Sequence, residues 1–351
     1  LSSTRHQARL LLDYRGEDPA WLDDAMRVPP VLVFTGHMID VRNRSRPRFT
    51  PDMEDAVRGR IREQMGRIAP VAVYGSAACG ADILVLECMR ELGGELHIVL
   101  PFPVEEFRAA SVDFRSDGRW SERFDKLQRE SHDVLVIGEK PQQNCPSAYE
   151  YANLIMTGLA RLRAEMLDTR LSGLAVWDGT GLGGVGGTGS VVSLWQKANV
   201  PLEHIDTAAI ACIAPTPDAE SADDEHKQTA SGRGQWEFDY AIKAILFADA
   251  VGYSRLSEQQ IPLFFEHYVG AIAAYNEATD HKPVHMETAG DGMYMVFDDT
   301  GTAGHYALGL SEMINAYDWQ SRGLPADLSV RKGVHCGPLL VAPDPITPQP
   351  R

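Results

Sequence analysis

Residues 245–254 read Ile-Leu-Phe-Ala-Asp-Ala-Val-Gly-Tyr-Ser, an apolar run that ends on the carboxylate of Asp249. The residues from Ala241 to Ala248 are almost all apolar, which is typical of a buried strand. We expect this strand to end at Asp249 and to lead at once into a helix that begins near Val251. Because a lone carboxylate is costly to bury unless it is paired or binds a metal, Asp249 indicates a site as well as a core.

A second carboxylate, Asp291, lies in the run Gly290-Asp-Gly292 between two apolar segments. Such a run predicts a β-hairpin. Since Asp-Gly is common in hairpins without any function, Asp291 taken alone is simply a turn residue. If the hairpin pairs beside the strand that ends at Asp249, both carboxylates lie at one edge of the sheet. They would then suit Mg²⁺, which typically binds one or two carboxylates together with substrate phosphates.

The rest of this half predicts an α+β, ferredoxin-like sheet. The hydrophobic pattern favours helices at residues 257–278 and 303–319 and strands at residues 284–287, 293–297 and 328–335. Together with the strand before Asp249, the order is βαββαβ, which is that of a split sheet. The aromatic stripe of the first helix is interpreted as a core face.

The segments Phe247–Leu256, Glu287–Gly292 and Arg331–Gly337 resemble motifs of the class III nucleotidyl (adenylate/guanylate) cyclase catalytic domain, over roughly residues 240–343. That family converts a nucleoside triphosphate into a 3′,5′-cyclic nucleotide and pyrophosphate, at a site shared between two domains. The resemblance implies a homodimer formed through this domain and two bound ions, Mg²⁺ or Mn²⁺. The implied catalytic residues are Asp249 and Asp291, the metal ligands are Asp249, Ala250 (through its carbonyl) and Asp291, and the substrate-binding residues are Val251, Gly252, Tyr253, Ser254 and Glu287.

Glu287 falls where this family places a residue that selects the base. A carboxylate there can accept hydrogen bonds from guanine N1–H and N2–H₂. Glu287 can equally be an exposed strand residue with no such role, and the base that is cyclised stays open.

The family continues with a helix that supplies an Asn and an Arg to the transition state, and no such helix follows Pro338 in this sequence. We therefore expect residues 237–351 to be the N-terminal, incomplete part of a cyclase domain that is inactive on its own. Because the sequence begins with Leu1, we also expect it to be a processed or excised piece. A catalytically incomplete regulatory or dimerisation module remains the alternative to an enzyme.

Residues 29–206 predict a different architecture, a doubly wound, mostly parallel Rossmann-like sheet. Short apolar strands alternate with helices, and such sheets bind ligands beyond the carboxyl ends of their strands. Three loops at those ends, residues 35–37, 75–80 and 179–189, are rich in small residues. Each loop taken singly can be a tight turn, but together they favour a nucleotide-type pocket. The expected strands are residues 31–34, 71–74, 96–100, 133–137, 174–177 and 200–205, and a helix is expected at residues 81–92, where Gly93-Gly94 ends it.

The same loops resemble the SLOG superfamily, Rossmann-like domains related to LOG-type and DprA-like proteins. The resemblance implies a domain that senses a nucleotide-derived ligand and regulates the cyclase. No catalytic glutamate can be matched, so a nucleotide hydrolase or transferase is kept only as an alternative. The implied pocket residues are Thr35, Gly36, His37, Gly75, Ser76, Gly80, Asp82, Asp178, Gly186, Gly187, Thr188 and Gly189.

Composition sets the remaining limits. Residues 1–28 are expected to form a polar N-terminal arm with some helix, for example at residues 8–14, and the acidic residues 207–236 a flexible linker. A net charge of −16 argues against a nucleic-acid partner. No apolar run reaches the ~18 residues of a membrane span. Five scattered cysteines without a CxxC pair favour a cytoplasmic protein that has no structural zinc.

Overall fold

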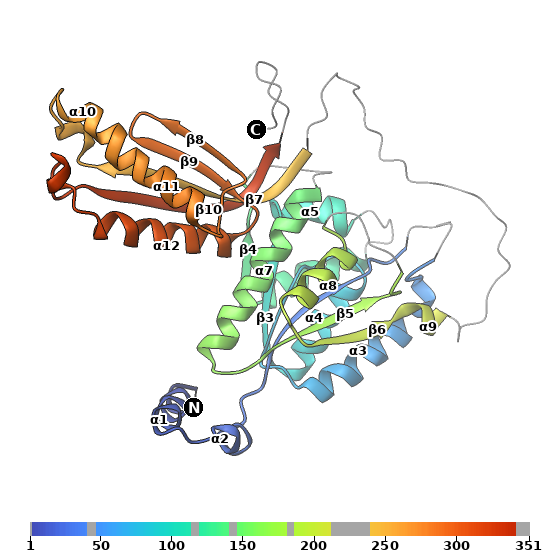
Figure 1. Cartoon of the computed structure of the whole chain (residues 1–351). Helices are drawn as coiled ribbons and strands as arrows, with labels where there is room; N and C mark the ends of the chain where they lie inside the picture. Colours follow the sequence, from blue (N-terminus) through green and yellow to red (C-terminus); the bar gives the residue numbers. More distant parts are fainter. Residues whose placement is uncertain are drawn as a thin grey trace, which may run out of the picture. The chain divides into compact units, whose positions relative to one another are not determined.

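A computed structural model of the chain describes residues 2–40, 47–113, 119–139, 146–180, 186–211 and 239–341. The chain divides into two compact units, Leu1–Thr229 and Ala230–Arg351, and each is described by itself (Figure 1). Most of the expected linker, part of the loop at residues 179–189 and the residues after 341 lie outside the described residues. Among the residues that the structure describes, every helix is too short or too polar to cross a bilayer.

The described part of the first unit forms a six-stranded parallel sheet with the order β4-β3-β2-β1-β5-β6. The doubly wound fold expected from the sequence is therefore confirmed. The order reverses between β1 and β5, which are neighbours in the sheet but far apart in the chain. The strands are β1 (Val31–Gly36), β2 (Ala72–Gly75), β3 (Glu95–Leu100), β4 (Asp133–Val136), β5 (Leu171–Trp177) and β6 (Leu202–Asp206).

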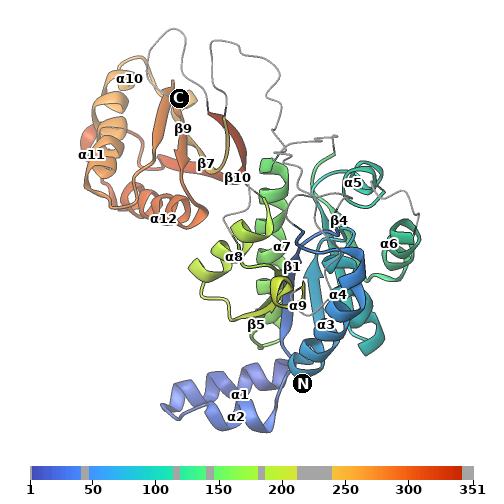
Figure 2. The ribbon, with the colours of Figure 1, turned by 90° about the vertical axis from the view of Figure 1, so that its right-hand side faces the viewer.

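Helices cover both faces of this sheet, because alternate residues of its strands are buried on opposite sides. Leu32 and Phe34 of β1 pack against one set of helices, and Val31 and Val33 pack against the other. Figure 2 shows α7 and α8 on one side of β1 and α3 and α4 on the other. The first set comprises α3 (Glu54–Ile68), α4 (Ala81–Leu92), α5 (Val104–Ser111), α6 (Arg119–Glu130) and α9 (Thr207–Ala211), and the second α7 (Pro146–Met166) and α8 (Thr188–Lys197).

The N-terminal residues are more helical than the sequence pattern indicates. Helix α1 spans Ser2–Arg15 and α2 spans Ala20–Ala25, where only a short helix near residues 8–14 was expected. Ion pairs from Arg5 and Arg9 to Asp168 hold α1 against the turn before β5. This tertiary contact, which a local pattern does not show, explains the longer helix.

The second unit contains a four-stranded antiparallel sheet with the order β10-β7-β9-β8. The central strand β7 pairs with β10 on one side and with β9 on the other, as the split βαββαβ sheet requires. The strands are β7 (Asp239–Val251), β8 (His285–Ala289), β9 (Gly292–Phe297) and β10 (Ser329–Val341). The helices are α10 (Gln260–Leu263), the π-helical segment η3 (Phe264–Val269), α11 (Gly270–Ala278) and α12 (Thr300–Ala316).

One face of this sheet is covered and the other is open. Leu246 and Ala248 of β7 are buried against the helices, and Figure 2 shows α11 and α12 on that side. On the opposite face Phe247 is 55% exposed, and its ring lies against that of Tyr294 of β9. This alternation along β7 gives the unit one apolar core and one sheet face available for a ligand or a partner.

The expected helix start at Val251 is wrong. Strand β7 continues through Asp249 to Val251, which pairs with Ser329 of β10. Gly252 then takes a left-handed φ of +100°, which ends the strand. A single 3₁₀ turn, Tyr253–Arg255, follows, and the first α-helix begins only at Gln260.

Candidate functional site

The hairpin in the second unit brings Asp291 next to Asp249. Asp249 of β7 lies opposite Gly292 of β9, and the N–H of Ala250 donates to the carbonyl of Asp291 over 3.2 Å. Gly290, with φ +65°, makes the tight turn. Burial raises the pKa of Tyr268 above its usual range, and the charges of Asp249 and Asp291 raise it further.

Asp249 carries an ion pair that the sequence did not reveal. Arg331 of β10 lies opposite Asp249 in the antiparallel register, and its Nη2 is 2.5 Å from Asp249 Oδ2. The Asp249 side chain is 38% exposed and that of Arg331 is 76% exposed. The pair is therefore open to solvent, where a competing cation or anion can separate it at little cost.

A cavity of about 570 Å³ on the open face of the sheet connects Asp249 with Glu287. Arg331 and Tyr294 also line it. Glu287 Oε1 lies 3.2 Å from Nε2 of His285, and its charge adds to burial in raising the pKa of Tyr294. The carboxylates of Asp249 and Glu287 thus line one cavity.

The residues expected to bind phosphate, Val251 to Ser254, lie at the end of β7 and in the turn after it. Ala250 is buried, Val251 is the last strand residue, and Gly252 leads into the turn Tyr253–Arg255. The N–H of Arg255 donates back to the carbonyl of Gly252, as at the start of a helix. A single 3₁₀ turn of this kind offers fewer N–H groups to an anion than the expected α-helix would.

The donor set suits a hard divalent cation. Among the residues described, no group of three or more His, Cys, Asp or Glu side chains is arranged to hold a metal. Two carboxylates, Asp249 and Asp291, and the Ala250 carbonyl are oxygen ligands of the kind that Mg²⁺ and Mn²⁺ take together with phosphate oxygens and water. Arg331 must release Asp249 before such an ion can bind.

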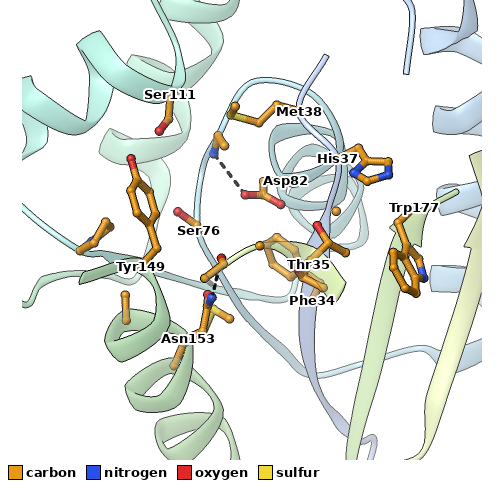
Figure 3. Close-up of a pocket in the computed structure, with 18 of the residues that line it drawn as sticks. Phe34, Thr35, His37, Met38, Ser76, Asp82, Ser111, Tyr149, Asn153 and Trp177 are labelled. Carbon is orange, nitrogen blue, oxygen red and sulfur yellow. Dashed lines mark hydrogen bonds between the residues drawn. The ribbon is translucent and has the colours of Figure 1, made fainter. Parts of the chain in front are cut away.

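The first unit contains a cavity of about 330 Å³ at the carboxyl ends of β1 and β5, where the strand order reverses (Figure 3). This is the place where open α/β sheets bind ligands. Of the residues expected in the pocket, those that line it are Thr35, Gly36, His37, Ser76, Asp82, Gly186, Gly187, Thr188 and Gly189.

The other three expected pocket residues, Gly75, Gly80 and Asp178, support its walls. A Cβ at Gly75 would lie 2.0 Å from the Phe34 ring, so the glycine allows close packing. Gly80 has φ +116°, and a Cβ there would meet the backbone N of Ile39 at 2.6 Å. Asp178 lies beside His37 at the end of β5.

His37 and Asp178 form a largely buried pair. Nε2 of His37 is 3.1 Å from Oδ1 of Asp178, and the two side chains are 7% and 10% exposed. Burial lowers the pKa of His37, although the hydrogen bond to Asp178 opposes this. Burial would raise the pKa of Asp178, but hydrogen bonds from Thr180 and His37 outweigh it and lower this pKa below its usual value. The pair therefore holds the loop after β5 against the end of β1.

Sequence motifs missed several residues of this cavity. Tyr149 and Asn153 of α7 point into it, with Trp177 across from them (Figure 3). Asn153 donates its amide to the carbonyl of Gly186 over 3.1 Å and so fixes the glycine loop before α8. Helix α7 has an ordinary apolar pattern, and only the three-dimensional packing shows which of its residues reach the pocket.

No family model matches the chain, and no curated protein matches it. Solved structures similar to it include members of the two groups that the sequence motifs indicated. A guanylyl cyclase domain of the RhoGC fusion protein from the fungus Blastocladiella emersonii is 17% identical, over 33% of this chain and 68% of that domain, with a TM-score of 0.24.

The second group contains Rossmann-like proteins. The Moco carrier protein of Chlamydomonas rheinhardtii is 14% identical, over 53% of this chain and 96% of that protein, with a TM-score of 0.28. DNA processing protein A from Streptococcus pneumoniae is 16% identical, over 56% and 65%, with a TM-score of 0.26. The chain spans 62% to 68% of the cyclase domains named among its matches. At such TM-scores these matches say nothing about activity.

Proposed function

We propose that the second unit is a nucleotidyl cyclase domain, and that the first unit is a SLOG-like domain that binds a nucleotide-derived ligand and regulates it. The reaction would convert a nucleoside triphosphate into a 3′,5′-cyclic nucleotide and pyrophosphate. The observation that supports this most is the cavity that joins Asp249 to Glu287, with Asp291 in the adjoining turn.

In this proposal some residues bind the metal and others bind the substrate. Asp249, Asp291 and the Ala250 carbonyl would hold Mg²⁺ or Mn²⁺, which when bound activates the attacking 3′-oxygen and offsets the charge of the leaving pyrophosphate. Glu287 orients the base from the far end of the cavity. Once Arg331 has released Asp249, its guanidinium remains beside the cavity as a cation for the phosphates.

The open face of the sheet is the surface for a second copy of the domain. Phe247 is an exposed apolar residue on that face, and it lines the cavity together with Tyr294. Association of two such faces would remove these side chains from water and would enclose the substrate. The proposed active form is therefore a homodimer.

The experiment incubates the chain with ATP, GTP, CTP or UTP and Mn²⁺ and detects cyclic products by mass spectrometry. Metal-dependent nucleotide binding is measured in parallel by calorimetry, because binding needs only the residues described above. Asp249→Asn and Asp291→Asn are each expected to weaken Mn²⁺-dependent nucleotide binding strongly, and to reduce any product formation as well, because each removes a charged oxygen ligand of the metal. The matched control is Asp298→Asn, an exposed carboxylate of the same unit that pairs with Lys243. Unchanged binding in both site variants would refute the proposal.

The ion pair between Asp249 and Arg331 favours a second candidate, a cyclase-like regulatory module without catalysis. A carboxylate already neutralised by an arginine is a poorer metal ligand than a free one. Metal-dependent nucleotide binding by the parent chain separates the two candidates, and Arg331→Ala tests whether the ion pair is what limits it. An enzyme should bind Mn²⁺ with the nucleotide in the parent chain, whereas a regulatory module should bind neither in the parent chain nor in the variant.

A further inference from the structure

A second cavity of the first unit lies at the amino end of the parallel sheet, opposite the cavity at the carboxyl ends of β1 and β5. Its volume is about 840 Å³, and its walls come from α1, the loop before β1, the end of α3 and the turn between α7 and β5. Figure 2 shows α1 and α2 beyond this end of the sheet. Five arginines line the cavity, namely Arg5, Arg9, Arg27, Arg67 and Arg170.

These arginines give the cavity a strong positive charge. Among the described residues that line it, Asp168 is the one acidic side chain, so five arginines and one aspartate leave a local charge of +4. The whole chain has a net charge of −16, so its composition does not predict such a cluster. Cations gathered around a concave space raise the local concentration of anions.

Three of the five arginines also have a structural role. Nε of Arg5 and Nε of Arg9 lie 3.1 and 3.2 Å from the carboxylate of Asp168, and these ion pairs hold α1 on the sheet. Arg67 lies in the last turn of α3, where the helix dipole favours a cation. The charge at these three positions is thus partly explained by the fold itself.

The other two arginines have neither kind of contact. Arg27 lies in the loop before β1 and Arg170 lies directly before β5, and both are exposed. Among the described residues, no carboxylate pairs with either of them. The Thr169 hydroxyl donates to the carbonyls of Val28 and Pro29 over 3.0 and 3.1 Å, which holds the two segments together. Like charges held close to one another repel, and a bound anion would remove that repulsion.

The lining of this cavity suits a compact anion with several phosphate groups. Guanidinium groups bind phosphate oxygens through two parallel hydrogen bonds. The volume is in the range of small-molecule sites, so a single orthophosphate would fill only a small part of it. The apolar residues that line it include no aromatic ring on which a base could stack. They are Val28, Pro29, Pro30, Ile68 and Ala69.

We propose that this cavity binds a small polyanion with two or more adjacent phosphate groups, and that Arg27, Arg67 and Arg170 bind its phosphates. Such a ligand would connect the loop before β1, the end of α3 and the start of β5, and would thereby stabilise the first unit. The binding needs neither a base nor a divalent metal. It is therefore independent of the nucleotide chemistry proposed for the two units.

The experiment measures binding of orthophosphate, pyrophosphate and tripolyphosphate to the full chain by calorimetry. EDTA is present, so that metal-dependent binding in the second unit does not contribute. The affinity is expected to rise along this series, by roughly 10-fold or more from orthophosphate to tripolyphosphate, because each further phosphate adds charge-assisted hydrogen bonds. Thermal unfolding of the first unit should be delayed by the three ligands in the same order.

The arginines of α3 provide a matched pair of variants. Arg67 and Arg60 both pair with Glu63, over 3.4 and 3.3 Å, and their side chains are 63% and 59% exposed. Of these two, Arg67 lines the cavity and Arg60 does not. Arg67→Gln should weaken tripolyphosphate binding by roughly 3- to 10-fold, and Arg27→Gln and Arg170→Gln should do the same. Arg60→Gln, which makes the same change in charge, should keep the parent affinity.

Three results would overturn the proposal. The first is that no phosphate compound binds in EDTA, and the second is an equal loss in Arg67→Gln and Arg60→Gln, which would indicate a general effect of charge. The third concerns a synthetic peptide of residues 218–225, which carries five acidic residues of the expected linker. If this peptide binds more tightly than tripolyphosphate and loses affinity in the same three variants, the cavity takes an acidic segment of protein instead.

Discussion

At the scale of single residues, Asp82, a buried carboxyl group in the first turn of α4, has a consequence for stability that is independent of any ligand. Its pKa is about 7 in the folded chain, against 3.8 as the ordinary value. Between these pH values the unfolded chain gives up this proton while the folded chain keeps it, so the free energy of unfolding falls as pH rises from about 4 to 7. Above pH 7 the loss is complete, at most about 4 kcal/mol.

We therefore predict that Asp82→Asn is more stable than the parent chain at pH 8 and similar to it at pH 5. Thermal unfolding at the two pH values measures this. The control is Asp55→Asn, which changes an exposed carboxylate in the first turn of α3 and should show no such trend. A stabilised variant would show that Asp82 is retained at a cost in stability. A variant that is less stable than the parent at pH 8 would contradict the prediction.

The residues of the two sites were predictable to different degrees. Asp249, Asp291 and Asp82 stand out in the sequence because each is a carboxylate beside apolar or glycine-rich segments. Arg331 could not be assigned to Asp249, because their contact depends on the register of two strands that are 82 residues apart. Registers of distant strands are fixed by packing across the whole sheet, and a local pattern does not contain them.

At the scale of elements, the π-helical segment Phe264–Val269 places the Tyr268 hydroxyl at Ser329, the first residue of β10. The Tyr268 hydroxyl donates to the carbonyl of Ser329 over 3.0 Å, and its ring stacks on Phe264. This bond ties the helical layer to the end of β10 beside β7. Tyr268→Phe is expected to destabilise the second unit by about 1 kcal/mol, the usual value of one such bond.

The matched control for this change is Tyr317→Phe. The Tyr317 ring stacks on Trp319, and among the described residues its hydroxyl has no partner. Urea denaturation should show a loss for Tyr268→Phe and almost none for Tyr317→Phe. Equal losses in both variants would mean that the ring environment, and not the bond to Ser329, determines the effect.

The sequence pattern predicted the regular helices and strands, but it did not predict the 3₁₀ and π-helical segments. Helix α4 was expected at Ala81–Leu92 and is found there, because its apolar face and the glycines after it agree. The 3₁₀ turn after Gly252 and the π-helical segment were missed. Both depend on how a short segment joins the sheet to its covering helices, and hydrophobic spacing does not distinguish them from an α-helix.

At the scale of the whole molecule, the two expected fold classes are both present, since each follows from a repeated pattern of strands and helices. Alternating strands and helices gave the parallel sheet, and the βαββαβ order gave the antiparallel one. The place of the first cavity also followed, because strand order and loop composition determine it. The cavity on the open sheet face could not be foreseen, since it depends on residues from four strands.

Each unit has its own apolar core, so we predict two separable unfolding transitions. The ion pairs of Glu87 with Arg58 and Arg123 belong to the first unit, and all three side chains are largely buried. Burial alone would raise the pKa of Glu87, but the hydrogen bonds from Arg123 and Arg58 lower it below its usual range. Its contribution to stability is therefore present at neutral pH and is lost as pH falls through the lowered value.

Glu87→Gln should accordingly shift only the transition of the first unit, by about 2 kcal/mol at pH 7 and less near pH 3, because it removes one of the two buried carboxylates that pair with Arg58 and Arg123, while the other, Glu54, stays. Tyr268→Phe should shift only the other transition. Differential scanning calorimetry of the full chain distinguishes the two. A single transition that both substitutions shift together would show that the two units unfold as one cooperative body, and that a signal from the first unit can reach the second through folding stability itself.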